Sequence, residues 1–217
     1  MRKLLLFAWP TADERRRALP GDGVVPNAAA EVMHAVTIRA PPECVWPWLA
    51  QMGAGRAGWY SYDSIDNDGH PSATKVIPEL QHLAVGDVVP ALPGARDSFI
   101  VAAVEPQRDL VLTVPEAGGG HLVSWEFFLE PRADGVRMLV RGRVGAKWPA
   151  GVARAPTGPP RPIERVYSLL GLMPRWTMAP LAKFGHGVMQ RRQLSGIKRR
   201  AEHLAGKARV GWAGDER

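Results

Sequence analysis

The fold is decided by residues 36 to 67, VTIRAPPECVWPWLAQMGAGRAGWYSYDSIDN, where a strand pattern, a helix pattern and an aromatic loop follow one another. Residues 34 to 40 alternate apolar and polar side chains, which predicts a β-strand. Residues 41 to 52 predict a helix, with an acid in its first turn and an apolar stripe formed by Val45, Leu49 and Met52. Gly53 marks the end of this helix. A strand followed at once by an amphipathic helix therefore opens the fold.

Three glycines after this helix, Gly53, Gly55 and Gly58, match the Gly-x-Gly-x-x-Gly pattern of dinucleotide-binding loops. That pattern binds pyrophosphate where it leaves a strand and opens a helix, because the phosphates sit on the N–H groups at the start of that helix. Here the glycines follow a helix. We therefore predict no cofactor, and we interpret the glycines as a tight turn that presents the aromatic residues after it.

Strand patterns separated by turns continue from residue 87 to residue 146, which predicts an antiparallel meander. Arg141 and Arg143 lie opposite the apolar residues of its last strand, so we expect them on the surface. A long helix begins near Leu181, and its apolar stripe must pack on the meander. One strand of the meander has an apolar face formed by Val123, Trp125, Phe127 and Leu129. The stripe of the helix consists of Phe184, Val188, Leu194, Ile197, Ala201 and Leu204.

Together with IPELQHLAVGDVVP at residues 77 to 90 and MQRRQLSGIKRRAEHLA at residues 189 to 205, the opening stretch resembles the START/polyketide-cyclase-like helix-grip superfamily (SRPBCC), and within it a bacterial branch. The resemblance implies an α+β helix-grip fold, in which a curved antiparallel sheet of seven strands wraps around a long C-terminal α-helix and leaves an apolar cavity. The patterns account for six strands, so we expect the seventh within residues 70 to 80. We predict an irregular N-terminal lead-in over residues 1–30 and a single START-like domain over residues 31–210.

The aromatic loop predicts a ligand site, because aromatic residues with polar tips suit a pocket that is mostly apolar and has a few orienting hydrogen bonds. The predicted ligand contacts are Trp59, Tyr60, Tyr62, Asp63 and Trp125. They favour binding of a hydrophobic or amphipathic small molecule, such as a lipid or a polyketide-like compound. The alternative is a cyclase, dehydratase or hydrolase of polyketide-like substrates, with Tyr60, Tyr62 and Asp63 transferring protons. The aromatic residues could also cap the core, and Asp63 with Asp66 could cap a short helix.

The sequence supports neither a metal site nor a disulfide bond. The six histidines show no spacing typical of metal ligands, and the single cysteine, Cys44, lies in an apolar helix pattern. We therefore predict no metal site. The apolar run at residues 4 to 9 is shorter than the roughly 7 to 15 residues of a signal peptide, which favours the cytoplasm.

Basic residues concentrate in the C-terminal part of the chain. Residues 1 to 131 carry a net charge of −6 and residues 132 to 217 carry +13. No aromatic residue interrupts the basic run over residues 190 to 209, so we do not expect nucleic acid as a partner. Residues 163 to 184 combine apolar, aromatic and basic side chains, which predicts a weak contact with an anionic membrane surface. The alternative is a lid or a dimer contact, and the oligomeric state does not follow from the sequence.

Overall fold

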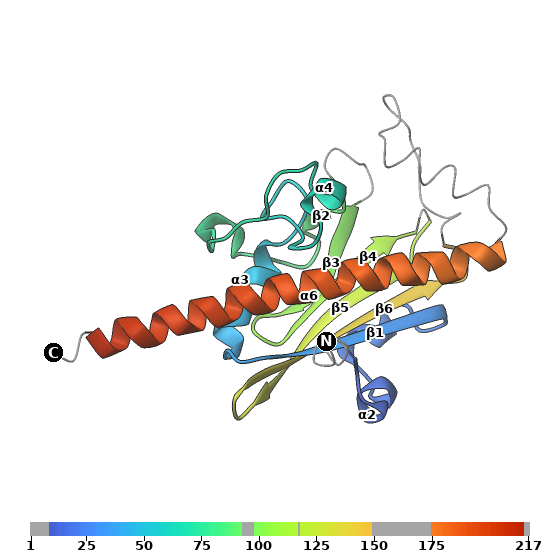
Figure 1. Cartoon of the computed structure of the whole chain (residues 1–217). Coiled ribbons are helices and arrows are strands. Elements are labelled where there is room, and N and C mark those ends of the chain that lie inside the picture. The colour runs from blue at the N-terminus through green and yellow to red at the C-terminus, as the bar shows by residue number, and fades with distance from the viewer. Residues whose placement is uncertain (1–8, 93–97, 117, 149–174, 215–217) are drawn as a thin grey trace.

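A computed structural model describes residues 9–92, 98–116, 118–148 and 175–214 (Figure 1), with the side chains of the last helix described over residues 185–208. The helices are α2 (Ala12–Arg16), α3 (Pro42–Gln51), α4 (Asp63–Asp66) and α6 (Arg175–Gly214), and the 3-10 helices are η1 (Pro20–Gly23) and η2 (Pro78–Leu80). The strands are β1 (Ala28–Ile38), β2 (Val88–Pro90), β3 (Ser98–Glu105), β4 (Asp109–Pro115), β5 (His121–Arg132) and β6 (Gly135–Gly145).

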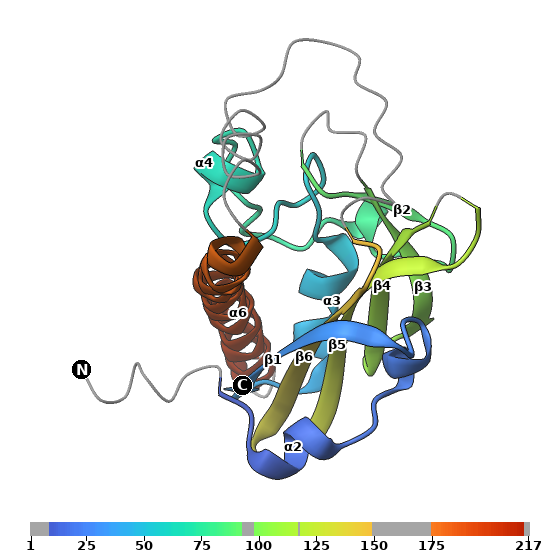
Figure 2. The ribbon, with the colours of Figure 1, turned by 90° about the vertical axis from the view of Figure 1, so that its right-hand side faces the viewer.

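The six strands form one antiparallel sheet in the order β1-β6-β5-β4-β3-β2. The sheet curves, and α3 and α6 lie together on its concave side while α2 lies on the other side (Figure 2). α6 runs across the sheet, and it packs against α3 and β1 (Figure 1). The predicted arrangement, a curved sheet wrapped around a long C-terminal helix, is confirmed.

Side chains alternate between the two faces of the sheet as the sequence predicts. Trp125 pairs with Leu112 of β4 and with Gly142 of β6, and Phe127 and Leu129 belong to the same concave core. On α6, the predicted stripe residues Leu194, Ile197 and Ala201 are fully buried against that core. Burying a large apolar side chain contributes roughly 1.5–3 kcal/mol, so the contact between helix and sheet is a major source of stability.

The inward face of α6 differs from the predicted stripe at one end. Val188 is exposed, whereas Gln190 and Gln193 are buried. The reason is helical geometry, because residues 190, 193, 194, 197 and 201 follow one another at the spacing of a single helix face, and residue 188 lies off that face. Leu204 is half-buried, and the side chain of Phe184 lies outside the described residues.

The prediction of a strand within residues 70 to 80 is wrong. This segment contains η2 and no strand, so the described residues form six strands. Pro71 and Pro78 cannot donate to a strand ladder. The segment is held by side chains instead, because Gln51 of α3 bonds to the backbone of Lys75 and Ile77.

The N-terminal segment is more regular than predicted. α2 and η1 precede β1, and β1 begins at Ala28 within the stretch expected to be irregular. A capping box stabilises α2, since Thr11 and Glu14 each bond the backbone N–H of the other. Leu19 and Val25 are buried, so this segment covers the convex face of the sheet. The division into a lead-in over residues 1–30 and a domain over residues 31–210 stays a prediction.

This covering segment corrects the predicted position of Arg141. Only 3% of the Arg141 side chain is exposed, and its guanidinium donates to both carboxylate oxygens of Asp22 at 2.9 and 2.7 Å. Arg143 is also covered, with 16% of its side chain exposed, and it donates to the carbonyl oxygens of Val25 and Pro26. The alternating strand pattern places both arginines on the convex face, but it does not show that another part of the chain packs there.

The glycine loop forms a tight turn, as predicted. Gly53 and Gly58 exchange backbone hydrogen bonds of 3.1 and 3.0 Å, with φ of +134° and +76°. Every backbone N–H from residue 53 to residue 58 donates to an acceptor within the protein. The loop is followed by a non-helical stretch before α4 begins at Asp63. It therefore offers no free N–H groups and no helix start to a pyrophosphate, unlike a dinucleotide-binding loop.

We expect the substitution Gly196→Ala to destabilise the protein by about 1–3 kcal/mol, the usual cost of overpacking a core contact. A Cβ at residue 196 of α6 would collide with the backbone carbonyl oxygen of Tyr60. The matched control is Gly206→Ala in the same helix, where a Cβ meets nothing within 4 Å. Alanine is the better helix former, so the control should gain up to about 1 kcal/mol. Urea unfolding of both variants tests this, and equal stability of Gly196→Ala and the unmodified protein would contradict it.

Candidate functional site

An aromatic cluster occupies the concave face of the sheet. It consists of Trp59 from the glycine loop, Phe99 from β3, and Trp125 and Phe127 from β5. The ring centroids of Trp59 and Trp125 are 5.3 Å apart, and that of Trp125 lies 5.4 Å from Phe99 and 4.9 Å from Phe127. These separations are typical of packed aromatic pairs. Trp59 and Trp125, two of the five predicted ligand contacts, therefore come together.

The concave face is closed at one end and open at the other. At the closed end, Ile38, Leu129, Val136 and Met138 are fully buried. At the opposite end, the concave side chains are only half-buried, although they belong to the same strands. We call this the open end, and it consists of Phe99, Val123, Trp125 and Val144. An apolar surface that is half covered can accept a ligand without unpacking the closed end.

Two buried glutamines of α6 stand next to the aromatic cluster. The indole N–H of Trp125 donates to Gln190 Oε1 at 3.1 Å, and Gln190 Nε2 donates to Gln193 Oε1 at 2.7 Å. Each glutamine is 2% exposed. The sequence analysis missed both residues because it considered only apolar side chains on α6. Their steps of three and four residues to Ile197 were the signal that could have placed them inside.

Buried charges lie away from this site. Among the described residues, the buried carboxylates and guanidinium are those of Asp66 in α4 and of Asp109, Glu126 and Arg141 on the convex face. Burial raises the pKa of Glu126 and of Asp109, and their mutual repulsion adds to the shift for Glu126. The two faces of one sheet therefore have opposite characters, since the concave face is apolar with two amides and the convex face is charged.

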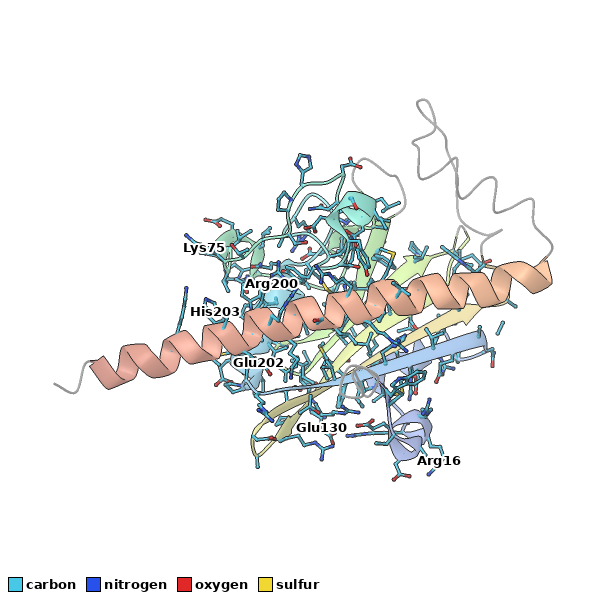
Figure 3. All side chains as sticks on the ribbon, in the orientation of Figure 1. Arg16, Lys75, Glu130, Arg200, Glu202 and His203 are labelled. Carbon is cyan, nitrogen blue, oxygen red and sulfur yellow. The ribbon has the colours of Figure 1, made fainter. Side chains whose placement is uncertain are left out.

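Tyr60 lies outside the aromatic cluster, packed between α3 and α6. Its ring contacts Trp48 edge-on with the centroids 6.0 Å apart, and the Arg200 guanidinium lies 4.6 Å from its centroid. Arg200 projects from α6 toward the segment that carries Lys75, and it donates to the carbonyl oxygen of Ala73 (Figure 3). Burial raises the pKa of the Tyr60 hydroxyl above its usual range. A buried phenol with a raised pKa holds its proton, which suits packing better than proton transfer.

Tyr62 and Asp63 also lie apart from the cluster. Tyr62 is 39% exposed, and the Arg192 guanidinium lies 5.8 Å from its ring centroid. The Asp63 carboxylate accepts hydrogen bonds from the backbone N–H and the hydroxyl of Ser72. Asp63 thus holds the loop together, and Asp66 beside it has a pKa raised to about 6 by burial and by the Asp63 charge. Ser72 links Tyr60 to Asp63, because its hydroxyl accepts from the backbone N–H of Tyr60 and donates to Asp63, whereas Tyr62 lies beside Arg192.

In comparisons with known proteins, the chain is similar to several solved structures. A scan against protein-family models found no match, and neither did a search of curated proteins. The structure of protein MLL2253 from Mesorhizobium loti is 17% identical with a TM-score of 0.39, over 82% of this chain and 98% of that one. The Polyketide_cyc-like protein Cgl2372 from Corynebacterium glutamicum is 16% identical with a TM-score of 0.33, over 84% and 93%. CalU16 from Micromonospora echinospora is 15% identical with a TM-score of 0.33, over 81% and 86%.

The arrangement of the chain itself assigns the fold. Six antiparallel strands curve around α3 and the C-terminal helix α6, with the N-terminal segment on the outside. The chain has the helix-grip fold. This is the fold that the sequence resemblance implied. The aromatic cluster and the two glutamines lie where the concave face meets the C-terminal helix.

The predicted contact with an anionic membrane surface, over residues 163 to 184, falls outside the described side chains. Residues 163 to 174 of the expected membrane contact lie outside the described residues, and residues 175 to 184 are described only as helical backbone. In the part of the chain that the structure describes, no helix is both long enough and apolar enough to cross a bilayer.

Proposed function

We propose that the protein binds a hydrophobic or amphipathic small molecule at the open end of the concave face. The observation that carries this proposal is the aromatic cluster beside α6, in which Phe99 and Trp125 are half-buried, on a face whose described core contains no buried carboxylate, lysine or arginine. Small-molecule sites are mostly lined by apolar and aromatic side chains with a few polar groups that fix orientation. The amides of Gln190 and Gln193 supply such groups here.

The proposed contacts are Trp59, Phe99 and Trp125. Tyr60, Tyr62 and Asp63 are left out of the contact set, because their side chains are engaged by Arg200, Arg192 and Ser72 away from the cluster. A cyclase, dehydratase or hydrolase that uses these three residues stays the alternative proposal. A lipid or a polyketide-like compound remains the proposed class of ligand. Attachment of residues 163 to 184 to an anionic membrane surface remains a separate proposal.

A fluorescence titration with N-phenyl-1-naphthylamine, a neutral apolar probe, tests the proposal. We expect saturable binding to one site, because the naphthalene ring of the probe can pack on the indole of Trp125 and on the aromatic rings beside it. The substitution Trp125→Ala should weaken binding about tenfold, since an aromatic contact is worth roughly 0.5–1.5 kcal/mol beyond its buried area.

The matched control is Tyr62→Ala, which removes an aromatic ring outside the cluster and should leave the affinity unchanged. Native mass spectrometry of the purified protein provides a second measurement, in which a retained small molecule would appear as an added mass. Absence of saturable binding, or equal affinity for the probe in Trp125→Ala and the unmodified protein, would overturn the proposal.

A further inference from the structure

The hydrogen bonds at the open end run in one direction. An indole N–H is a donor only, so Trp125 requires an acceptor from its partner and thereby fixes the orientation of the Gln190 amide. Gln190 presents Oε1 to Trp125, and its Nε2 must then donate to Gln193 Oε1. Gln193 is fixed in turn, and its Nε2 points to the sulfur of Met52 at 4.0 Å. The chain of bonds therefore begins at Trp125 and ends on a thioether, which is a weak acceptor.

Because the hydrogen bonds run in this direction, the two amides have more N–H donors than acceptors to receive them. The two amide nitrogens carry four N–H groups, and within the described residues they have two acceptors, Gln193 Oε1 and the Met52 sulfur. Two N–H groups are thus left without an acceptor there, although both side chains are 2% exposed. Buried polar groups normally find partners, and an N–H group buried without one is costly. What these N–H groups lack among the described residues is a hydrogen-bond acceptor.

The charge of the missing acceptor follows from its surroundings. A buried carboxylate or phosphate needs a cation close by, because burial of an unpaired charge is far more costly than burial of a neutral polar group. The buried guanidinium of Arg141 lies on the other face of the sheet. On α6, Arg191 lies over the ring of Trp9, and Arg192 lies over that of Tyr62. Also on the concave side are His34 of β1 and His186 of α6, with ring centroids 5.9 Å apart.

We propose that Gln190 and Gln193 select ligands that carry a neutral hydrogen-bond acceptor, such as a ketone, ester or amide carbonyl, on an aromatic or other apolar body. The inference rests on the proposed function and makes it more specific. The apolar body packs on the rings of Trp59, Phe99 and Trp125, while the carbonyl oxygen accepts from the amide N–H groups. In this arrangement the aromatic cluster provides affinity for the apolar body, and the amide pair distinguishes ligands that carry an acceptor from those that do not.

Three probes with the same naphthalene body test the inference: 2-acetylnaphthalene, 2-ethylnaphthalene and 2-naphthoate. Their dissociation constants can be measured by quenching of tryptophan fluorescence. We expect the ketone to bind about three- to tenfold more tightly than the ethyl compound, the usual gain from a net hydrogen bond. The carboxylate should bind at least about tenfold more weakly than the ketone, because the described arginines beside the site on α6, Arg191 and Arg192, lie over the rings of Trp9 and Tyr62.

The substitution Gln190→Met keeps the side-chain length and removes the amide. It should abolish the preference for the ketone while the affinity for 2-ethylnaphthalene stays the same or increases. Gln193→Met serves as a second variant if Gln190→Met does not fold. The matched control is Gln81→Met, because the Gln81 amide bonds to α3 and to Ile77 outside the site, and its preference should equal that of the unmodified protein.

The outcomes separate the two proposals. If none of the probes binds, the proposed function fails and the inference fails with it. If all three bind with equal affinity, the apolar site stands and the selection by the amide pair is overturned. If the carboxylate binds most tightly, the acceptor is anionic and the inference is likewise overturned.

Discussion

Substitution of Arg141 by alanine is expected to destabilise the protein by about 3–5 kcal/mol, the usual cost of removing one partner of a buried ion pair. Arg141 is 3% exposed, and it donates to Asp22 and to the carbonyl oxygen of Arg17 at 2.9 Å. It also lies opposite Glu126 in the pairing of β5 with β6. Its loss leaves Asp22 with Arg143 alone, at 3.5 Å, and removes one of the attachments of the N-terminal segment to the sheet. Urea or thermal unfolding measures the effect.

Arg108→Ala is the matched control for this substitution. Arg108 also forms an ion pair, with Glu105 at 3.0 Å, but 59% of its side chain is exposed. Exposed pairs contribute between 0 and about 1 kcal/mol, so the control should remain close to the unmodified protein. A loss of less than about 1 kcal/mol in Arg141→Ala would show that the convex face does not depend on this pair. Limited proteolysis offers an independent measurement, because a detached N-terminal segment should be cleaved faster.

Stability is expected to fall as the pH rises through neutrality, because of Glu126. Burial and the charge of Asp109 raise the pKa of Glu126, although the N–H of Gly21 donates to its carboxyl and opposes the shift. In the unfolded chain this group loses its proton near the ordinary value of 4.5. The stabilising contribution is complete below that pH and is lost as the pH approaches the higher pKa of the folded state. The slope can reach about 1.4 kcal/mol per pH unit for one proton.

The substitution Glu126→Gln should flatten this dependence. A neutral amide has the shape of the protonated acid, so the variant should be more stable than the unmodified protein near pH 8 and similar to it near pH 5. Unfolding free energies measured in urea at each pH give the difference between the two proteins, in which the titration of groups that do not interact with Glu126 cancels, whereas that of Asp109 contributes.

Glu130→Gln is the control. Although burial opposes the shift, hydrogen bonds from Arg17 and Arg132 lower the pKa of Glu130. Its contribution is therefore lost only as the pH falls into the acidic range, and its removal should not change the slope between about pH 5 and pH 8. Parallel pH profiles for Glu126→Gln and the unmodified protein would show that Glu126 is ionised in the folded state, contrary to the expectation.

Local patterns predicted those parts of the fold that depend on local geometry. The strand and helix at residues 34 to 52, the turn at Gly53 and the apolar face of β5 each follow from a repeat or a capping residue within a short stretch. The placement of Arg141 could not be predicted in this way, because its burial depends on Asp22, a residue 119 positions away. An alternating strand pattern predicts which side chains share a face of the sheet, but it does not predict what covers that face.

The candidate site shows the same limit. Trp59 and Trp125 were predicted as ligand contacts, and they lie together because the glycine turn and β5 meet on the concave face. Gln190 and Gln193 were missed since a search for an apolar stripe discards polar side chains. Only the oxygen of Gln190 gains a partner from the sheet, because it accepts from the indole N–H of Trp125. Complementary polar pairs between distant segments carry no periodic signal in the sequence.

The convex face is covered by the first segment of the chain and the concave face by the last, and this bears on how the protein is made. The N–H of Gly21 reaches Glu126 across 105 positions, and the N–H of Arg39 reaches Glu202 across 163. During synthesis the N-terminal segment leaves the ribosome long before the strands that it covers, and α6 emerges after every strand of the described sheet. Contacts so distant along the chain slow folding and leave unpaired surface exposed in the meantime. The concave face of the sheet therefore stays uncovered until α6 has been made.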